Sequence, residues 1–466
     1  MRAHKTLLSL ILMLALAGCK VGPNYVRPTS DVPGGFRGQA PDLDKTGASA
    51  ESLGDAKWWT VFQDEQLQTL IRTAVANNYD ARIAAERVVA AGAQLGITRA
   101  DQLPSLSASG VLTSVRTGKT TLSPAYQAET GQLALSASWE LDFWGKYRRA
   151  TEATRADLAA TEWGRRAVIS TLVSNVASAY FQLRTLDLEL EITQGTLKSR
   201  QESLQLTRAL SDGGSVPLMD VRQAEQLVYT ASAQIPTLEK QIEQQENYIS
   251  ILMGQNPGPI ARGRKLTDQP LLPSVPAGLP SQLIERRPDI HQAEEQLIAA
   301  NARIGVAKAA YFPSISLTGA AGYQSAALTS LFSGPAGLWS TGISATQPIF
   351  EGGRIRSNVH LTESQQRQAL LFYRQTTQGA FRDVSDSLIA YRKSREAREQ
   401  QQLLTAAAQD SARLSHVRYD AGATSYLEVL TNETNYYNAE LSLSQAQFSE
   451  VLAVVQIYNA LGGGWQ

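Results

Sequence analysis

The stretch "LGITRADQLPSLSASG", residues 95–110, decides the fold, because its pattern returns as "IGVAKAAYFPSISLTG" at residues 304–319. Glycine, proline and serine occupy equivalent positions in the two stretches. Similarity at a long, fixed spacing is typical of a chain that contains the same structural unit more than once. We therefore expect two copies of one unit along this chain.

A second pair of similar stretches supports the repeat. "SDGGSVPLMDV" at residues 211–221 aligns with "YDAGATSYLEV" at residues 419–429, which places Gly214 opposite Gly422. Glycine is the residue that most often ends a helix, because it adopts the left-handed conformation without strain. Each of these glycines is therefore expected to form a tip at which a long helix turns back.

Four segments show the alternation of a β-strand. In "QLALSASWELDFWG", residues 132–145, apolar and polar residues alternate with a period of two, and residues 106–112, 315–319 and 339–345 do so less strongly. Each repeat thus contributes one β-hairpin, so the chain has four strands. About ten residues is the length that a tilted strand needs to cross a bilayer. A soluble β-sandwich is the alternative interpretation.

Most of the remaining sequence is predicted to be helical. Residues 145–209 and 352–419 contain no proline, and apolar residues recur in both at heptad spacing. In the first segment this stripe consists of Val176, Leu183, Leu190, Leu197 and Leu204. Patterns of this length exceed those of ordinary globular helices. We therefore expect coiled coils in which a long helix packs against shorter ones.

The four strands are too few to close a membrane barrel, because the smallest such barrels have eight. Their edges must then pair with other copies of the chain. Two chains would give eight strands filled by side chains, whereas three would give twelve and leave a lumen. Three chains are favoured, because only an open lumen explains why the inward face of the strands is small and polar, and symmetry closes such a ring.

The N-terminus carries a signal for export. Arg2 and Lys5 precede a short apolar run that ends in "LAGC", residues 16–19, and this run contains the only cysteine, Cys19. That ending is the pattern of a bacterial lipobox, so we expect acyl chains, palmitate among them, on Cys19. Several such chains anchor a protein stably to a membrane. Lys20 in place of aspartate favours the outer membrane. A plain signal peptide with an incidental cysteine is the alternative.

These patterns define the predicted domain organisation. Residues 1–18 form the signal peptide and residues 19–60 a lipidated N-terminal tail. The first repeat covers residues 61–256 and runs helix, β-hairpin, long helix, tip and helix, and the second covers residues 282–466. A linker at residues 257–281 separates the repeats, because this segment is rich in proline.

Composition argues against several other functions. The chain has 43 basic and 43 acidic residues, so it lacks the overall positive field that nucleic acids attract. His291, His360 and His416 lack the spacing of metal ligands and are expected on solvated helix surfaces. No nucleophile–base pair stands out in the sequence. We therefore predict that the chain is not an enzyme, binds no metal, and carries no cofactor other than the covalent lipid on Cys19.

Several motifs resemble those of one protein family. They are "CKVGPNYVRP" (19–28), "FQDEQL" (62–67), "RRPDI" (286–290), "FPSISLTG" (312–319) and "FEGGRIR" (350–356). The chain resembles the outer-membrane factors, which are TolC-like efflux channels, and in particular their lipid-anchored OprM and NodT branch. The resemblance implies a fold that is mainly α with β: a homotrimer whose transmembrane β-barrel, with four strands per chain, lies in the outer membrane and is continued by a long periplasmic α-helical coiled-coil barrel. It also implies a passive export duct for drugs or other small molecules.

Two partners follow from the same resemblance: a periplasmic adaptor, or membrane fusion protein, and an inner-membrane efflux pump of the RND type. Outer-membrane lipid would surround the barrel, and the family has no chemistry of its own. The alternative from another class is a structural coiled-coil lipoprotein that spans the periplasm as a spacer. Four alternating strands with a polar second face favour the duct, because a spacer would not need them.

The resemblance further implies a gate at the periplasmic tips. Tyr419 would bond to Asp220 and hold neighbouring coiled coils together, while Glu428 would form a ring of charge near the threefold axis. The tip turns at Gly214 and Gly422 would contact the adaptor. The alternative is that these side chains are ordinary exposed residues of helix turns.

The sequence departs from the family at two positions of this gate. Thr431 occupies a position where relatives carry a second aspartate ring, and Thr434 occupies one where some carry arginine. A gate with two charged rings is therefore not expected to be complete in this chain.

Overall fold

The computed structural model describes most of the chain. The described residues are 20–29, 31–38, 52–119, 121, 124–269, 278 and 280–465. The predicted signal peptide and Cys19 lie outside these residues, as do residues 39–51 of the tail and residues 270–277 of the linker.

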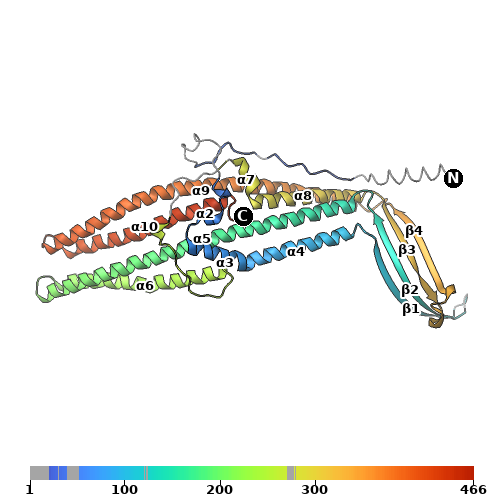
Figure 1. Ribbon diagram of the computed structural model, residues 1–466, viewed down its shortest axis with the longest axis horizontal. Helices are drawn as coiled ribbons and strands as arrows, with labels where there is room; N and C mark the ends of the chain where they lie inside the picture. The colour runs from blue at the N-terminus through green and yellow to red at the C-terminus, as the bar shows by residue number, and fades with distance from the viewer. Residues whose placement is uncertain are drawn as a thin grey trace. The chain divides into compact units, whose positions relative to one another are not determined.

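The tandem repeat is confirmed by helices of equal length in equivalent positions (Figure 1). Each copy has a helix of 22 residues, one of 67 and one of 35. They are α4 (Tyr79–Ala100), α5 (Lys146–Asp212) and α6 (Leu218–Leu252) in the first copy, and α8 (Pro288–Ala309), α9 (Arg354–Asp420) and α10 (Tyr426–Ala460) in the second. Within the described residues, no helix is long and apolar enough to cross a membrane.

Shorter elements fill the connections between these helices. They are η1 (Leu53–Asp55), α2 (Trp58–Val61), α3 (Glu65–Asn77), η2 (Leu266–Asp268), α7 (Pro280–Arg286), η3 (Leu328–Ser330) and η4 (Gly334–Ala336).

The chain divides into two compact units, and each takes segments from both repeats. The first unit comprises residues 1–29, 87–162 and 292–374, and the second comprises residues 30–86, 163–291 and 375–466. The first unit contains the sheet, and the second contains the coiled coils and the tips. The compact units therefore cut across the repeats, whose boundaries in the sequence stay a prediction.

The first unit is built on a single antiparallel sheet of four strands in the order β1-β2-β3-β4 (Figure 1). The strands are β1 (Ser105–Thr117), β2 (Tyr126–Leu141), β3 (Ser314–Ser325) and β4 (Gly337–Thr346). Each repeat supplies one hairpin, as predicted, and β2 pairs with β3 to join the two hairpins. Two strands, β1 and β4, therefore lie at the edges of the sheet within one copy.

The register of the sheet sorts apolar and polar residues onto opposite faces. Trp139 lies opposite Leu317, which lies opposite Ile343 in the next strand. On the other face Ser136 lies opposite Ala320. Every residue of β1 is exposed, and Ile343 is 72% exposed. The single chain therefore leaves an apolar face of its sheet uncovered.

The strand of ten or more residues expected within residues 132–145 is β2, which begins before this stretch and ends at Leu141. The Asp142 carboxylate accepts hydrogen bonds from the backbone amides of Tyr147 (3.2 Å) and Arg148 (2.8 Å). It thereby caps the start of α5. Gly145 adopts a φ of +78°, which a strand does not contain. Alternation continued past this point in the sequence, but the capping carboxylate ends the strand.

Arg149 in α5 holds the N-terminal tail against the first unit. Its side chain is 1% exposed, and it donates hydrogen bonds to the carbonyl oxygens of Val21 (3.1 Å) and Gly22 (3.1 Å) and to Asn24 Oδ1 (2.9 Å). Glu152 pairs with Arg149 at 3.1 Å and so balances its buried charge. Residues 21–24 of the tail are therefore bound to α5.

The heptad stripe of α5 forms the core of the second unit, as predicted. Val176 and Leu183 are fully buried, and Leu204 is buried near the tip. Figure 1 shows α6 running back along α5 and α10 running back along α9. Gln245 on α6 donates to the Ala179 carbonyl of α5 at 2.8 Å. Each long helix thus forms a coiled coil with the shorter helix that follows it.

Asp64 anchors the start of α3 and the linker at one buried carboxylate. Its Oδ1 accepts from the amide of Gln66 (2.9 Å) and so caps α3, while its Oδ2 accepts from Tyr180 OH (3.0 Å) and the amide of Arg264 (2.9 Å). Asp64 is 1% exposed, so these donors replace water around its charge.

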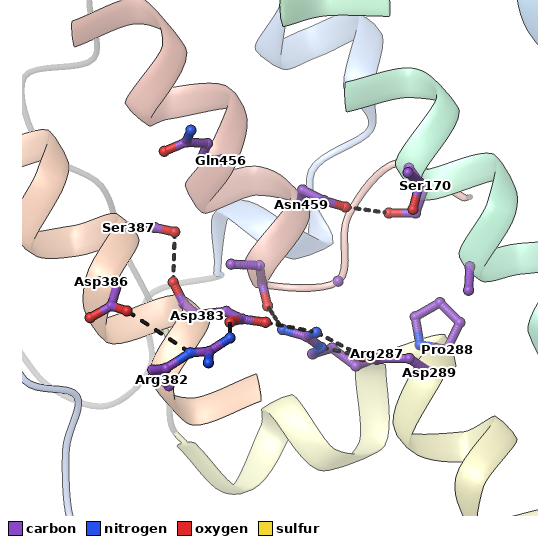
Figure 2. Close-up of a pocket in the computed structure, with 14 residues that line it drawn as sticks. Ser170, Arg287, Pro288, Asp289, Arg382, Asp383, Asp386, Ser387, Gln456 and Asn459 are labelled. Atoms are coloured by element: carbon purple, nitrogen blue, oxygen red, sulfur yellow. Dashed lines mark hydrogen bonds and ion pairs between the residues drawn. The ribbon is translucent and has the colours of Figure 1, made fainter. Parts of the chain in front are cut away.

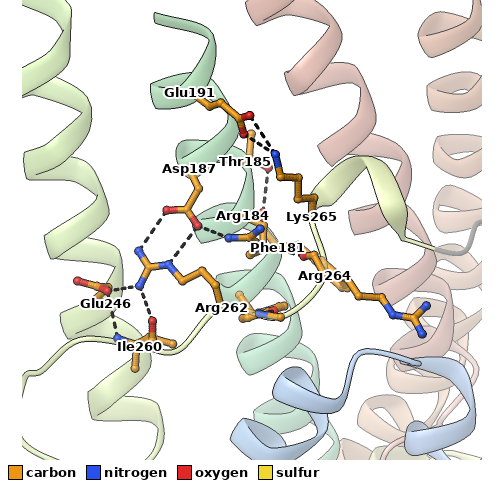
Figure 3. A network of polar contacts seen from close by, with 12 residues as sticks. Phe181, Arg184, Thr185, Asp187, Glu191, Glu246, Ile260, Arg262, Arg264 and Lys265 are labelled. Carbon is orange, nitrogen blue, oxygen red and sulfur yellow. Dashed lines mark hydrogen bonds and ion pairs between the residues drawn. The ribbon is translucent and has the colours of Figure 1, made fainter. Parts of the chain in front are cut away.

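Charged residues of the linker bind the first coiled coil (Figure 3). Arg262 reaches Asp187 on α5 through two nitrogens at 3.1 Å each and also pairs with Glu246 on α6. Lys265 pairs with Glu191 at 2.9 Å. Paired contacts of arginine with carboxylates fix geometry as well as charge. The described part of the linker is therefore bound to α5 and α6.

Candidate gating site at the helical tips

Both tips end their long helices with the same turn. Gly214 has a φ of +76° and Gly422 a φ of +67°. The amide of Ser215 donates to Leu210 O and the amide of Ala423 to Arg418 O, both at 2.8 Å. A left-handed glycine with this bond is the Schellman motif. The two tips predicted from the aligned glycines therefore share one conformation.

A small hydrophobic core lies behind the tips. It consists of Leu204, Val221, Ala224, Val228, Tyr426 and Val429, with Leu197 and Tyr419 packed against it. Its members come from α5, α6 and α10, so both repeats contribute. The Tyr419 and Tyr426 rings meet edge to face with centroids 5.3 Å apart. This packing positions the Tyr419 side chain at the junction of the two coiled coils.

Tyr419 and Asp220 are brought together. Tyr419 OH, from the last turn of α9, donates a hydrogen bond to Asp220 Oδ2, in the first turn of α6, at 3.3 Å. Burial, together with the adjacent Asp220 carboxylate, raises the pKa of Tyr419 to about 12. The hydroxyl therefore stays protonated and remains a donor over the physiological range. A bond of this kind at a partly exposed site contributes about 1 kcal/mol or less.

Glu428 does not join this pair. Its Oε1 pairs with Arg418 Nη1 at 3.0 Å, and its Oε2 accepts from Thr424 Oγ1. Its charge is therefore balanced within its own hairpin. Sequence reasoning missed Arg418, which directly precedes Tyr419. A basic residue before a tip and an acidic residue after it could have predicted the Arg418–Glu428 ion pair.

Thr431 and Thr434, the two departures from the family, bind only their own helix in the structure. Thr431 Oγ1 donates to Leu427 O and Thr434 Oγ1 to Leu430 O, both at 2.8 Å. Neither position adds charge to the tip region.

Further polar contacts join α5 to α10 behind the tips, and sequence reasoning did not identify them. Thr193 Oγ1 and Tyr437 OH lie 3.0 Å apart, and Ser203 Oγ and Tyr426 OH lie 3.3 Å apart. These contacts connect the first repeat to the second. Their positions follow from how two coiled coils pack together, which no pattern within one helix reveals.

The histidines are placed differently from expectation. His360 is exposed, as predicted, but His291 stacks on Trp163 with centroids 4.2 Å apart, and His416 bonds to Glu433 at 2.7 Å. Both remain partly exposed on their helices, so the prediction of helix surface holds in part for His291 and His416, and an aromatic ring and a carboxylate from other segments cover one side of each. No group of three or more potential metal ligands occurs among the described residues.

The "RRPDI" segment lines a cavity of about 500 Å³ in the second unit (Figure 2). Arg287 pairs with Asp289 at 2.7 Å and with Asp383 on α9 at 3.3 Å, and it donates to the Ala460 carbonyl at 3.1 Å. The Arg287 side chain is 12% exposed. Its donors are thus used to hold α9 and the end of α10 beside the start of α8.

A sheet with one apolar and one polar face, joined to paired helical hairpins that contact each other at their tips, is the architecture of a membrane channel subunit. The model of one family, described as outer membrane efflux proteins, matches residues 70–255 and again residues 279–463. The chain belongs to the outer membrane efflux protein family. It is an efflux channel protein of the outer membrane.

Curated relatives match over nearly their whole length. The cation efflux system protein CusC of Escherichia coli O6:H1 is 35% identical over 463 residues, covering 99% of both chains. The toluene efflux pump outer membrane protein TtgC of Pseudomonas putida is 35% identical, covering 99% of this chain and 96% of TtgC. The probable outer membrane lipoprotein SilC of Salmonella typhimurium is also 35% identical, covering 98% of both.

Solved structures match the whole fold. The open-state crystal structure of the MtrE outer membrane channel of Neisseria gonorrhoeae superimposes with a TM-score of 0.86 at 31% identity, covering 96% of this chain and 99% of MtrE. A mainly helical chain with a four-stranded sheet and an internal repeat is therefore a known channel fold.

Proposed function

We propose that this chain forms, as a homotrimer, the outer-membrane duct of a tripartite efflux system. The duct is passive, and a periplasmic adaptor and an inner-membrane pump open it at its tips. One observation carries this proposal: the sheet of each copy has an apolar face, a small polar face and two edges that pair with no other strand among the described residues.

Three copies can pair both edge strands of each sheet, which one copy cannot do. Pairing of the β1 edge of one copy with the β4 edge of the next closes twelve strands and leaves no free edge. The apolar face then meets lipid, and the face with Ser136 and Ala320 lines a lumen.

The N-terminal tail anchors the duct on the periplasmic side of the outer membrane. We propose that Cys19 carries the acyl chains, as its lipobox predicts and as the name of the lipoprotein SilC supports. The Arg149 contacts begin only two residues after Cys19, at Val21. The anchor is therefore tied closely to the unit that contains the sheet.

Substrate choice belongs to the pump more than to the duct. The relatives CusC and TtgC are named for cations and for toluene, yet both are 35% identical to this chain. Overall similarity therefore does not select between ionic and apolar substrates. We propose an RND-type pump and small molecules, drugs included, as the exported class.

The contact between Tyr419 and Asp220, which we name the tip latch, is proposed to hold the duct closed. It joins α9 of the second repeat to α6 of the first, so it opposes separation of the two coiled coils. Glu428, which pairs with Arg418 within one chain, is proposed to lie near the threefold axis as part of the gate. The turns at Gly214 and Gly422 are proposed to contact the adaptor.

Single-channel recording of the purified protein in planar lipid bilayers tests the duct. We expect discrete conductance steps from the fraction that light scattering in detergent identifies as three chains. A monomeric protein that never conducts would contradict the duct and would favour the periplasmic spacer. Dissociated monomer from the same preparation serves as the matched control.

A further inference from the structure

A stripe of basic side chains runs along the first part of α9. Arg356, His360, Arg367 and Arg374 follow one another at intervals of four or seven residues, so they share one side of the helix. All four are exposed, and all belong to the first unit. We name this set the basic stripe.

The charge of the basic stripe is not cancelled within the described part of the chain. None of its three arginines forms an ion pair or a hydrogen bond with another described residue. Glu363 lies between His360 and Arg367 on the same side of α9, but Lys308 of α8 binds it at 3.0 Å. The basic stripe therefore keeps a net positive charge and attracts anions.

Contacts of α8 show which side of the helices carries the basic stripe. Glu294, Asn301 and Lys308 lie seven residues apart on α8, so they share one side of it. Glu294 accepts a hydrogen bond from Tyr25 of the tail, and Asn301 donates one to a tail carbonyl, both at 3.0 Å. Lys308 binds Glu363, which lies within the stripe. The tail and the basic stripe therefore follow the same side of α8 and α9.

That side is the outer surface of the duct. This step rests on the proposed function, in which lipid outside the barrel holds Cys19. The tail begins at Cys19, so the side of the helices that it follows faces the periplasm and not the lumen. An anion bound to the basic stripe then lies outside the export path.

The length of the basic stripe indicates the kind of anion. Arg356 lies ten residues after the end of β4 at Thr346, and Arg374 lies 18 residues further along α9, which is about 27 Å at 1.5 Å per residue. The headgroup layer of one leaflet is only roughly 5–8 Å deep. Lipid headgroups therefore reach only the start of the stripe, whereas an extended polymer can follow all of it.

The basic stripe offers charge without an apolar anchor. Its successive heptad positions are His360, Arg367 and Arg374, and all three are polar. Protein partners usually bury an apolar or aromatic centre in their interface. A hydrated polyanion needs no such centre, because electrostatic attraction alone binds it. The stripe therefore suits an anionic polymer better than an acidic protein.

We propose that the basic stripe binds peptidoglycan, a hydrated glycan polymer whose peptide stems carry carboxylates. Arg356, Arg367 and Arg374 pair with carboxylates along the helix, and three copies present three such stripes around one duct. Each later contact forms at high effective concentration, so weak contacts add up. The cell wall then holds the duct in addition to the lipid anchor.

Co-sedimentation of the full-length trimer, in detergent, with purified peptidoglycan sacculi tests this contact. We expect the trimer to pellet with the sacculi at about 50 mM salt and to be released at about 500 mM, because salt screens exposed charges. Sacculi whose carboxylates have been amidated serve as the matched ligand control. They should bind the trimer at least about tenfold more weakly.

A stripe variant locates the contact on the protein. It combines Arg356→Gln, Arg367→Gln and Arg374→Gln, and we expect its dissociation constant for sacculi to rise at least about tenfold. Its control combines the three changes Arg392→Gln, Lys393→Gln and Arg413→Gln, which remove the same charge from exposed positions further along α9. The control should bind like the unchanged protein.

Three results would each overturn the proposal: no sedimentation of the unchanged trimer, equal binding to amidated sacculi, or equal binding of the stripe variant. If the stripe variant keeps binding sacculi but loses added phosphatidylglycerol, measured as lipid phosphorus, the stripe serves headgroups instead. Planar-bilayer recording separates this test from the duct. Conduction without sedimentation contradicts only the peptidoglycan contact, whereas sedimentation without conduction contradicts only the duct.

Discussion

His416 makes the stability of the region behind the tips depend on pH. Its hydrogen bond to Glu433 raises the pKa of His416 above its usual value, against the opposing effect of burial. A raised folded-state pKa means that the pair stabilises the fold fully below about pH 6.5, the value for an unperturbed histidine. This stabilisation is lost as the pH rises through the raised pKa.

We therefore expect His416→Gln to lower the thermal unfolding midpoint more at pH 6 than at pH 9. His360→Gln, a change on the exposed face of α9, is the control and should have little effect at either pH. An equal loss for His416→Gln at both values would show that the histidine charge contributes nothing.

At the level of single residues, part of the tip could be identified from the sequence. Tyr419 and Asp220 were named through the family resemblance, and the structure places them in contact at 3.3 Å. The pairing of Glu428 with Arg418 was not anticipated, because it depends on the turn between their helices. The contact of His416 with Glu433 was missed for the same reason. The sequence shows which residue types lie near a turn, but which of them pair depends on how the hairpin closes.

The helices were the most predictable elements, because hydrophobic period and the absence of proline extend over many residues. The expected long helix at residues 145–209 corresponds to α5, Lys146–Asp212, and the expected helical segment at residues 352–419 corresponds to α9, Arg354–Asp420. The C-terminal end of β2 was less predictable, since alternation alone does not show where a side chain such as Asp142 caps the next helix. The pairing of β2 with β3 across the repeats also required the structure.

The tip turns are expected to need glycine at only one position each. Gly214 has a positive φ, whereas Gly213 lies outside that region and an added Cβ there meets only ordinary contacts. We predict that Gly214→Ala destabilises the tip by about 1–2 kcal/mol. Gly213→Ala, its matched control, should be close to neutral.

Hydrogen exchange of the tip amides measures this difference. Faster exchange in Gly214→Ala alone is the expected result. Equal exchange in the two variants would contradict the role assigned to the left-handed glycine.

The N-terminal tail is expected to depend on Arg149. Arg149→Met keeps most of the apolar stem but removes the donors to Val21, Gly22 and Asn24. The segment should then detach, and chymotrypsin should cleave after Tyr25 much faster than in the unchanged protein. Arg148→Met, at the neighbouring and more exposed position, is the control. Unchanged cleavage in Arg149→Met would show that other contacts hold the tail.

At the scale of the whole molecule, the described residues of one copy leave apolar surface exposed. On α9, Leu403, Leu404, Leu414 and Val417 are exposed by 46% to 65%. Exposed apolar residues that gather on one element mark an interaction surface. Together with the open edges of β1 and β4, they support an assembly in which neighbouring copies cover both the sheet edges and the coiled coils.

The conductance of a latch variant tests most directly whether contacts between the repeats keep the duct closed. In planar bilayers, Tyr419→Phe combined with Asp220→Ala should conduct severalfold more than the unchanged protein, because it removes the tip latch without disturbing the core behind it. Tyr229→Phe combined with Asp212→Ala changes an exposed tyrosine and an exposed aspartate near the same tips, and should conduct like the unchanged protein. Equal conductance in all three proteins would contradict closure by the tip latch.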